Sequence, residues 1–399
     1  MRRICIASNT YYLPQTPRLP DTPRGSYSFA MKPPVVAFTA CPDYGPALAP
    51  ALEALLAHLG GWSALVQPGQ KVLVKPNLLS DATPDQAITT HPELVRQVVR
   101  GLKAAGAIVQ VGDSPAGAMN LEQVWHKTGI GEVCTSEQVP LLAFERGGTR
   151  QVPRDGYVFA VANAVLEADL IVSLPKVKTH SLTTLTAAVK NFYGVLPGYQ
   201  KAQLHKACPK PRRFCRLLRA VHAAMPPNLS IADGVIGMDG DGPSGGTPVR
   251  LGFLAVSTDA VALDLALCQA LRIDPRRVPY LADVHTAPFE RRGSTPDVSR
   301  FDLPSGSGRL LQLFPEPLLR LAMPLVWIRP AFNEQCVFCG RCAAACPARA
   351  LIVTHGKRPV LNHRKCIACC CCHEVCPAHA IRMRRSPLLR MVGTFRELV

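Results

Sequence analysis

Eight cysteines near the end of the chain occur in two blocks with the same internal spacing. The blocks read Cys336-x2-Cys339-x2-Cys342-x3-Cys346-Pro347 and Cys366-x2-Cys369-x2-Cys372-x3-Cys376-Pro377, so every cysteine and the proline recur 30 residues later. Three closely spaced thiolates followed by Cys-Pro are typical of iron–sulfur loops, whereas zinc sites use Cys pairs separated by a longer spacer. The duplication therefore predicts two 4Fe-4S clusters.

The fourth thiolate of each block, beside proline, is expected to serve the cluster of the other block. Cluster 1 is then held by Cys336, Cys339, Cys342 and Cys376, and cluster 2 by Cys366, Cys369, Cys372 and Cys346. Residues 331–385 resemble bacterial two-cluster ferredoxins, which implies one-electron transfer and passage of electrons between the clusters. Cys370 and Cys371 lie inside the second loop, either as spare thiols packed against cluster 2 or as an alternative ligand or redox-responsive site.

The composition indicates a folded protein kept in a reducing compartment. Apolar residues make up 48% of the 399 residues, enough to build a core, and no apolar run is long enough for a membrane span. The N-terminus lacks the apolar core of a secretory signal. The 16 cysteines are therefore expected to be metal ligands or redox groups in the cytoplasm rather than disulfides.

Proline and cysteine divide the chain into four parts. Residues 1–34 contain six prolines without a hydrophobic period, which predicts a flexible arm, and either Met1 or Met31 could be the true start. Residues 35–300 are expected to form one α/β domain. Residues 301–330 read as a linker, whose apolar stretch 318–328 packs on a domain or touches a membrane surface. Residues 331–399 read as a small α+β ferredoxin-like domain with a basic C-terminal tail.

Within residues 35–300, short β-branched runs alternate with helical stretches. Candidate strands are 35–40, 71–76, 108–112, 158–162, 170–175, 229–232 and 251–256, and candidate helices include 47–59, 91–105, 121–127 and 260–271. Such alternation predicts an α/β fold with a mostly parallel sheet flanked by helices. Ligands of such sheets bind beyond the carboxyl ends of the strands.

Polar residues follow these strand ends and are expected to share one crevice. The catalytic candidates are Lys75, Lys176, Lys178, His180, Lys190 and His205, and the other candidate binding residues are Asn77, Asp113, Asp233, Asp239 and Asp241. Lysines would hold a carboxylate or phosphate as point charges, and His180 or His205 would supply a proton. The Asp and His residues could instead hold a divalent metal in pairs. Each charged residue, taken alone, could also be a solvated turn residue. Thr89 or Thr90 is expected to cap the following helix and leave its amides free for an anion.

Six segments with these residues follow one another along the α/β part. They are Lys75-Pro76-Asn77-Leu78, Thr89-Thr90-His91-Pro92-Glu93, Gly112-Asp113-Ser114-Pro115, Pro175-Lys176-Val177-Lys178-Thr179-His180, Lys190-Asn191-Phe192-Tyr193-Gly194 and Asp239-Gly240-Asp241-Gly242-Pro243. In this order they resemble the domain-of-unknown-function 362 (DUF362) family, from about Val35 to Asp283. Members of that family often carry a C-terminal ferredoxin module with an extra cysteine at the position of Cys371. The family has no general reaction assigned, and the basic stretch 208–215 departs from it as a candidate partner-docking surface.

The net charge of +17 is concentrated in three places. Residues 1–34 contribute +4, residues 201–220 contribute +7 and residues 331–399 contribute +8. This distribution predicts an acidic redox partner protein or an anionic small molecule. Nucleic acid is disfavoured, because the eight Tyr and three Trp are not interleaved with the arginines as stacking surfaces would be.

Two functions from different classes fit these features. The leading hypothesis is an iron–sulfur redox enzyme component that couples one-electron transfer to an anionic small molecule in the α/β crevice. The alternative is a non-enzymatic electron-transfer or cluster-assembly subunit whose α/β domain docks a partner protein. No Walker A motif is present and no G-x-G-x-x-G directly follows a predicted strand, which disfavours a nucleotide site. Convergence of the strand-end residues on an enclosed pocket would favour the enzyme.

Overall fold

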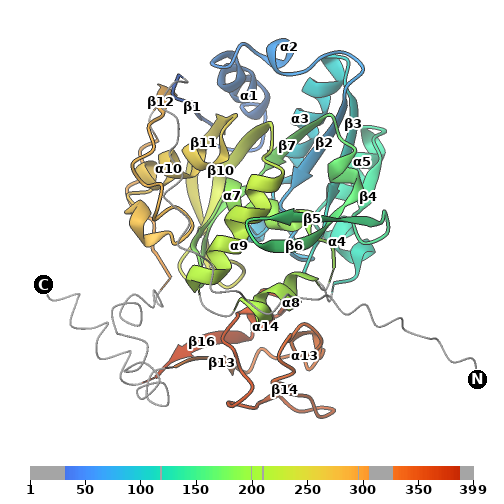
Figure 1. Cartoon of the computed structure of the whole chain (residues 1–399), viewed down its shortest axis with the longest axis vertical. Helices are drawn as coiled ribbons and strands as arrows, with labels where there is room; N and C mark the ends of the chain where they lie inside the picture. The colour runs from blue at the N-terminus through green and yellow to red at the C-terminus, as the bar shows by residue number, and fades with distance from the viewer. Residues whose placement is uncertain are drawn as a thin grey trace, which may run out of the picture.

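The computed structural model describes residues 32–116, 119–198, 200–208, 211–294, 296–304 and 327–386. A ten-stranded sheet with helices on both faces forms the larger part, and a small module lies beyond one end of it, beside α8 (Gln200–Ala207) (Figure 1). No helix in these segments is long and apolar enough to cross a membrane. The predicted arm before residue 32, the linker residues 305–326 with most of the stretch 318–328, and the tail after residue 386 lie outside the described residues.

The central sheet is mostly parallel, as the sequence predicts. Its strand order is β12-β1-β11-β10-β7-β2-β3-β4. The bounds are β1 Val35–Ala40, β2 Lys71–Pro76, β3 Ile108–Asp113, β4 Leu141–Ala143, β7 Leu170–Leu174, β10 Leu229–Asp239, β11 Thr247–Ser257 and β12 Glu290–Gly293. β11 pairs antiparallel with β1 and β10, and the other neighbours in this order pair in parallel. The carboxyl ends of the parallel strands therefore meet at one edge.

Two hydrophobic cores cover the two faces of the sheet, because successive strand side chains point to opposite sides. In β2, Val72 and Val74 belong to one core and Leu73 to the other. The first core is closed by α1 (Leu48–Ala57), α3 (Pro92–Ala104), α4 (Leu121–Lys127) and α5 (Ile130–Ser136). The second is closed by α7 (Ala188–Asn191), α9 (Pro211–Ala224) and α10 (Ala260–Ala270). The helices thus flank the sheet on both sides.

The start of α3 differs from the prediction. Its N-cap is His91, whose Nδ1 accepts a hydrogen bond from the Glu93 amide, and Pro92 occupies the first turn. Thr90 instead donates its hydroxyl to the Leu174 carbonyl (2.6 Å) and accepts from the Asn77 amide (2.8 Å). Thr90 therefore joins the ends of two strands, and the predicted anion site at this helix start is wrong.

Residues 176–180, expected as a loop after a strand, form a strand of their own. β8 (Lys176–His180) pairs in parallel with β10 and antiparallel with β9 (Thr184–Thr186). The cause is the length of β10, which continues past the predicted end at Ala232 to Asp239 through an irregularity between Gly234 and Ile236. The predicted strand 158–162 forms but does not belong to the central sheet. It is β6 (Tyr157–Ala162), which pairs with β5 (Thr149–Arg154) in a separate antiparallel hairpin.

The small module contains two two-stranded sheets and two single-turn helices. β13 (Ile328–Phe332) pairs with β16 (Ile381–Arg385), and β14 (Leu351–Ile352) pairs with β15 (Val360–Leu361), both antiparallel. The helices are α13 (Arg341–Ala344) and α14 (Cys371–Glu374), and each follows the cysteine loop of its block. The module is consistent with a small α+β fold.

The duplication of the two blocks extends to the backbone. Phe338 and Ala368, 30 residues apart, both have a left-handed φ (57° and 53°). Gly340 and Cys370 are the next equivalent pair, with φ of 73° and 65° at the N-caps of α13 and α14. Left-handed φ favours glycine. Cys370 therefore occupies a turn position in the second loop that glycine fills in the first.

Candidate functional site

A cavity of about 100 Å³ lies where the carboxyl ends of the strands face the small module. Four lysines reach it, and we call it the lysine pocket: Lys75, Lys178, Lys190 and Lys201. Its other polar lining groups are Asn77, Asp113, Ser114, Thr186, Asn191, Tyr193, His205, Cys371 and Glu374. The last two belong to α14, so the wall of the pocket is built from both parts of the molecule.

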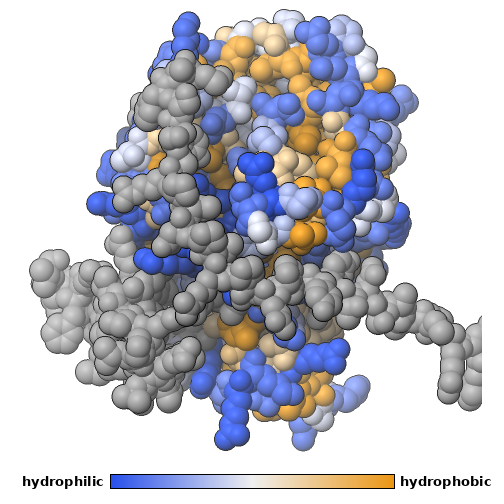
Figure 2. Space-filling view, viewed as in Figure 1, coloured by the Kyte–Doolittle hydropathy of each residue, from blue (hydrophilic) through white to orange (hydrophobic). Residues whose placement is uncertain are grey.

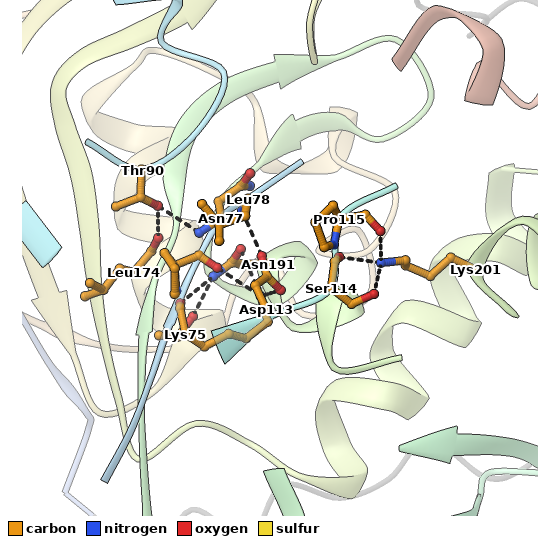
Figure 3. A network of polar contacts seen from close by, with 12 residues as sticks. Lys75, Asn77, Leu78, Thr90, Asp113, Ser114, Pro115, Leu174, Asn191 and Lys201 are labelled. Atoms are coloured by element: carbon orange, nitrogen blue, oxygen red, sulfur yellow. Dashed lines mark hydrogen bonds and ion pairs between the residues drawn. The ribbon is translucent and has the colours of Figure 1, made fainter. Parts of the chain in front are cut away.

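An ion pair between neighbouring strands forms one side of the pocket (Figure 3). Lys75 Nζ at the end of β2 lies 2.7 Å from Asp113 Oδ1 at the end of β3, and both side chains are buried. Asp113 Oδ2 accepts from the Leu78 amide, and Lys75 Nζ also donates to Asn191 Oδ1. Burial lowers the pKa of Lys75, and the Asp113 carboxylate opposes that shift. The pair is thus fixed in place before any ligand arrives.

Lys178 and Lys190 place two further amines in the pocket. Lys178 Nζ donates to the Ile88 carbonyl (2.5 Å). Burial lowers the pKa of Lys178 well below its ordinary value, and the charge of Lys190 lowers it further. Burial also lowers the pKa of Lys190, while Glu374 opposes the shift. Lys190 makes no hydrogen bond or ion pair with another described residue, so its amine is available to a ligand.

Lys201, on α8, is a pocket residue that the sequence analysis missed. Its Nζ donates to Ser114 Oγ (2.7 Å), to the Pro115 carbonyl (2.6 Å) and to the Ser114 carbonyl (Figure 3). Burial lowers the pKa of Lys201 to about 8. A lysine within a helix carries no spacing signal, and only the folded chain brings Lys201 to the end of β3.

The two candidate histidines have different surroundings. Nδ1 of His180 accepts from the Leu182 amide (3.0 Å), so the ring proton lies on Nε2 and is donated to Glu374 Oε1 (3.0 Å). Burial, aided by the charge of Lys190, lowers the pKa of His180 to about 3 and keeps the ring neutral. His205 lines the pocket and stacks on Phe214, and burial lowers its pKa to about 4. His205 is therefore the histidine that faces a ligand.

Glu374 was also missed, because it stands between two cysteines of the second block. Burial alone would raise the pKa of Glu374, but the hydrogen bond from His180 and the charge of Lys190 lower it well below its usual range. Its carboxylate thus balances part of the lysine charge around the pocket.

Two buried polar atoms in the pocket have no partner in the described part of the chain. They are Asn77 Oδ1 and Thr186 Oγ1. Buried polar atoms are normally hydrogen bonded, because an unpaired one forfeits its interaction with water. Both atoms are therefore free to contact a polar ligand.

The eight block cysteines gather in two sets. Cys336, Cys339, Cys342 and Cys376 line one small cavity in the module. Burial raises the pKa of Cys372, and the charges of Cys370, Cys369, Cys366 and Cys346 raise it further. The fourth cysteine of the second block, Cys376, thus lies with the thiols of the first block.

The donor chemistry of each set fits a 4Fe-4S cluster. Four thiolates are the ligands such a cluster takes, and each binds a different iron atom, so they need not meet at one point. A single metal ion is a different case: no group of three or more His, Cys, Asp or Glu side chains in the described segments is arranged to hold one. Backbone amides of Ala350 and Ala380 donate to the sulfurs of Cys346 and Cys376 (3.3 and 3.2 Å), and such hydrogen bonds tune the potential of a cluster.

Comparison with known proteins places this architecture in a family. The sequence profile of DUF362, a domain of unknown function, matches residues 72–269, and that of a 4Fe-4S binding domain matches residues 332–352. A thylakoid-associated protein of Synechocystis sp. is 34% identical over 276 residues, which cover 69% of this chain and 84% of that protein. This chain belongs to the DUF362 family. Its 4Fe-4S binding domain makes this DUF362 protein an iron–sulfur protein.

Solved structures are more distant from this DUF362 protein. The lactate racemase apoprotein of Thermoanaerobacterium thermosaccharolyticum aligns at 14% identity with a TM-score of 0.42, over 60% of this chain and 57% of that one. A Thermotoga maritima protein aligns at 13% identity with a TM-score of 0.33, over 50% of this chain and 52% of that one. The DUF362 protein thus spans little more than half of either structure.

Not every residue predicted for the crevice of this DUF362 protein lines the lysine pocket. Lys176 Nζ pairs with Asp233 Oδ2 (2.9 Å), both fully buried, and Asp233 also accepts from the Tyr44 hydroxyl (2.6 Å) and the His91 amide (2.9 Å). These residues form a separate network that fixes the loop of Tyr44 to the strand ends. Neither Asp239, which accepts from the Asp302 amide, nor the exposed Asp241 lines the pocket. The residues that the sequence analysis assigned to one crevice therefore lie in at least two separate groups.

Polar contacts hold the iron–sulfur module of the DUF362 protein against the α/β part. Arg341 Nη1 lies 3.0 Å from Asp81 Oδ1, and Lys127 contacts the same carboxylate at 3.3 Å. Burial alone would raise the pKa of Asp81, but Arg341 and Lys127 lower it. Further contacts join His180 to Glu374 and Ser244 to the His373 carbonyl. These contacts position α14 against the lysine pocket.

Proposed function

We propose that this protein is a redox enzyme component that couples one-electron transfer through two 4Fe-4S clusters to an anionic small molecule bound in the lysine pocket. The observation that carries the proposal is that the second set of thiols adjoins the pocket. Cys371, next to Cys372, lines the pocket, and so does Ala345, next to Cys346. A ligand there lies beside the residues that would hold cluster 2.

The charge of the pocket supports an anion. Four lysines face it against the carboxylates of Asp113 and Glu374, and burial lowers the pKa of each lysine. Removing these ammonium groups from water is costly, and a negative ligand restores part of the lost stabilisation. A volume of about 100 Å³ has room for roughly seven to ten water-sized spheres, which fits an anion of a few heavy atoms.

The chain supplies defined roles for such a ligand. Lys190 and Lys201 would bind its charge, Asn77 and Thr186 would hydrogen bond to it, and His205 would exchange a proton with it. Clusters 1 and 2, when bound, supply one electron each. Glu374 would hold His180 through their hydrogen bond and offset part of the charge of Lys190.

The alternative is a non-enzymatic electron-transfer or cluster-assembly subunit. Convergence of lysines on a cavity, rather than along an open face, favours the enzyme. We place the protein in the cytoplasm because so many free thiols require reducing conditions, and the thylakoid association named for its relative makes a membrane surface the second candidate location.

Anaerobic purification tests the proposal. We expect about eight iron atoms and eight acid-labile sulfides per chain, and a change in the electron paramagnetic resonance spectrum of reduced cluster 2 on adding a small anion such as acetate, phosphate or sulfate. Cluster 1 is the internal control, since its signals should not change. An iron-free protein would contradict the coupling. So would a protein that binds an anion by calorimetry while the spectrum of reduced cluster 2 stays unchanged.

The pKa of Lys201 gives a pH dependence for anion binding. Its amine is charged below pH 8 and loses its charge above it, so affinity for acetate should fall as the pH rises from 7 to 9. The loss should be about tenfold, because the anion loses the attraction of one nearby buried charge, and binding at pH 8 should take up protons. Calorimetry in buffers of different ionisation enthalpy measures both. Lys201→Met should flatten this part of the profile, whereas Lys206→Met, an exposed lysine of the same helix, should not.

A further inference from the structure

Large hydrophobic residues are exposed mainly on the iron–sulfur module. Five of the seven in the described segments lie there: Val337, Phe338, Ile352, Val353 and Val360, each at least 41% exposed. We call these five residues the apolar rim. Figure 2 shows hydrophobic residues reaching the surface of the module among hydrophilic ones on the face drawn. An exposed group of this kind marks an interaction surface.

Three of the five residues of the apolar rim lie beside the first set of thiols, and none of the five lines the lysine pocket. Val337 and Phe338 stand between Cys336 and Cys339 in the chain, and with Val353 they line the same cavity as the four thiols of that set. Cys339 is itself exposed, whereas no thiol of the second set is. The first set thus reaches solvent through Cys339, while Cys371 and Ala345, the chain neighbours of Cys372 and Cys346, line the lysine pocket.

A basic edge borders the apolar rim. Residues 353–365, which include the turn from β14 to β15, contain four basic residues and no acidic one. All four are exposed: Lys357, Arg358, Arg364 and Lys365. Across the described module, ten Lys and Arg stand against two Glu, Glu334 and Glu374. A protein that docks here gains attraction if its own surface is acidic.

We propose that the apolar rim and its basic edge form the docking surface for an acidic one-electron carrier protein. The inference rests on the proposed function. The carrier is oxidised by one electron and the cluster beside Cys339 is reduced by one, or the reverse, and no bond is made or broken. The position of the rim beside an exposed thiol favours a carrier over a lipid surface, because a lipid surface has no need of a nearby electron acceptor.

The test uses the anaerobic holoprotein and an acidic plant-type 2Fe-2S ferredoxin as the probe. Calorimetry measures the dissociation constant of the complex between the two proteins at low and high salt. Stopped flow measures the rate at which the holoprotein oxidises the reduced ferredoxin. Wild type should bind it more weakly as salt rises. Lys357→Glu with Arg358→Glu should weaken binding at low salt at least tenfold and reduce the salt dependence. Val337→Ser with Val360→Ser should weaken binding at both salt concentrations.

Arg212→Glu is the matched control, because this exposed arginine of α9 belongs to the other basic segment. Binding reduced by Arg212→Glu and not by the rim variants would overturn the proposal. Holoprotein that contains eight irons but does not bind the ferredoxin would also overturn it. Protein that contains no iron would instead contradict the proposed function. Anionic phosphatidylglycerol vesicles are tested in parallel, and vesicle binding lost in the rim variants with unchanged ferredoxin binding would assign the surface to a membrane. Iron content and visible absorbance equal to wild type exclude misfolding.

Discussion

Replacing Cys376 with alanine is expected to remove cluster 1 and leave cluster 2 in place, although Cys376 belongs to the second block. The physical reason is that Cys376 lines the cavity of Cys336, Cys339 and Cys342. Iron content should fall from about eight to about four atoms per chain. Iron analysis and electron paramagnetic resonance of the reduced protein measure the change. Cys346→Ala should remove cluster 2 instead.

Cys371→Ala is the matched control for this experiment. Cys371 is a buried cysteine of the same module, but it lines the lysine pocket and fills no place in either set of four. The variant should keep about eight irons. A Cys376→Ala protein that loses the signals of cluster 2 and keeps those of cluster 1 would refute the exchange of the fourth ligands. Loss of iron from Cys371→Ala would make Cys371 a ligand.

Replacing Lys190 with methionine is expected to weaken binding of acetate or phosphate about ten- to hundredfold without changing the iron content. An interaction with a charged group contributes about 1.5–3 kcal/mol, and the Lys190 amine has no hydrogen bond or ion pair with the other described residues that its removal would leave broken. Methionine keeps most of the apolar stem. Calorimetry at pH 7 measures the loss.

Lys206→Met provides the control for Lys190→Met, because Lys206 is exposed and lies outside the pocket. Removal of Lys176 would be a poor test, since it would leave the buried carboxylate of Asp233 without its partner. Unchanged affinity in Lys190→Met, with intact cluster spectra, would show that anions do not bind in the lysine pocket.

Local sequence signals predicted much of the fold. The alternation of β-branched runs and helical stretches predicts the parallel strands, because the central strands such as β2 and β7 bury both faces, while covering helices such as α3 bury one. The sequence did not predict β8, because Val177 is the one apolar residue among Lys176–His180 and the pairing depends on the extension of β10 beyond Ala232. Pairing between segments far apart in the chain has no local signal.

The residues of the candidate site also divide into those with a local sequence signal and those that only tertiary packing brings together. Lys75, Asn77 and Asp113 could be predicted because the carboxyl ends of neighbouring parallel strands meet at one edge. Lys201 and Glu374 could not, since one comes from a helix and the other from the iron–sulfur module, and only tertiary packing brings them to that edge. Lys176 follows a strand as expected, but its buried pair with Asp233 occupies its amine.

The origin of the pocket wall in α14 has a consequence for the maturation of the protein. The helix follows Cys369 and contains Cys372, so the loop that carries Cys371 and Glu374 is organised by the thiols of the second set. A newly made chain without iron lacks the bonds that fix this loop, because metal binding and local folding are coupled. If the lysine pocket binds an anion, immature copies would have an incomplete binding site, and the chain would bind the anion only after receiving its iron and sulfide.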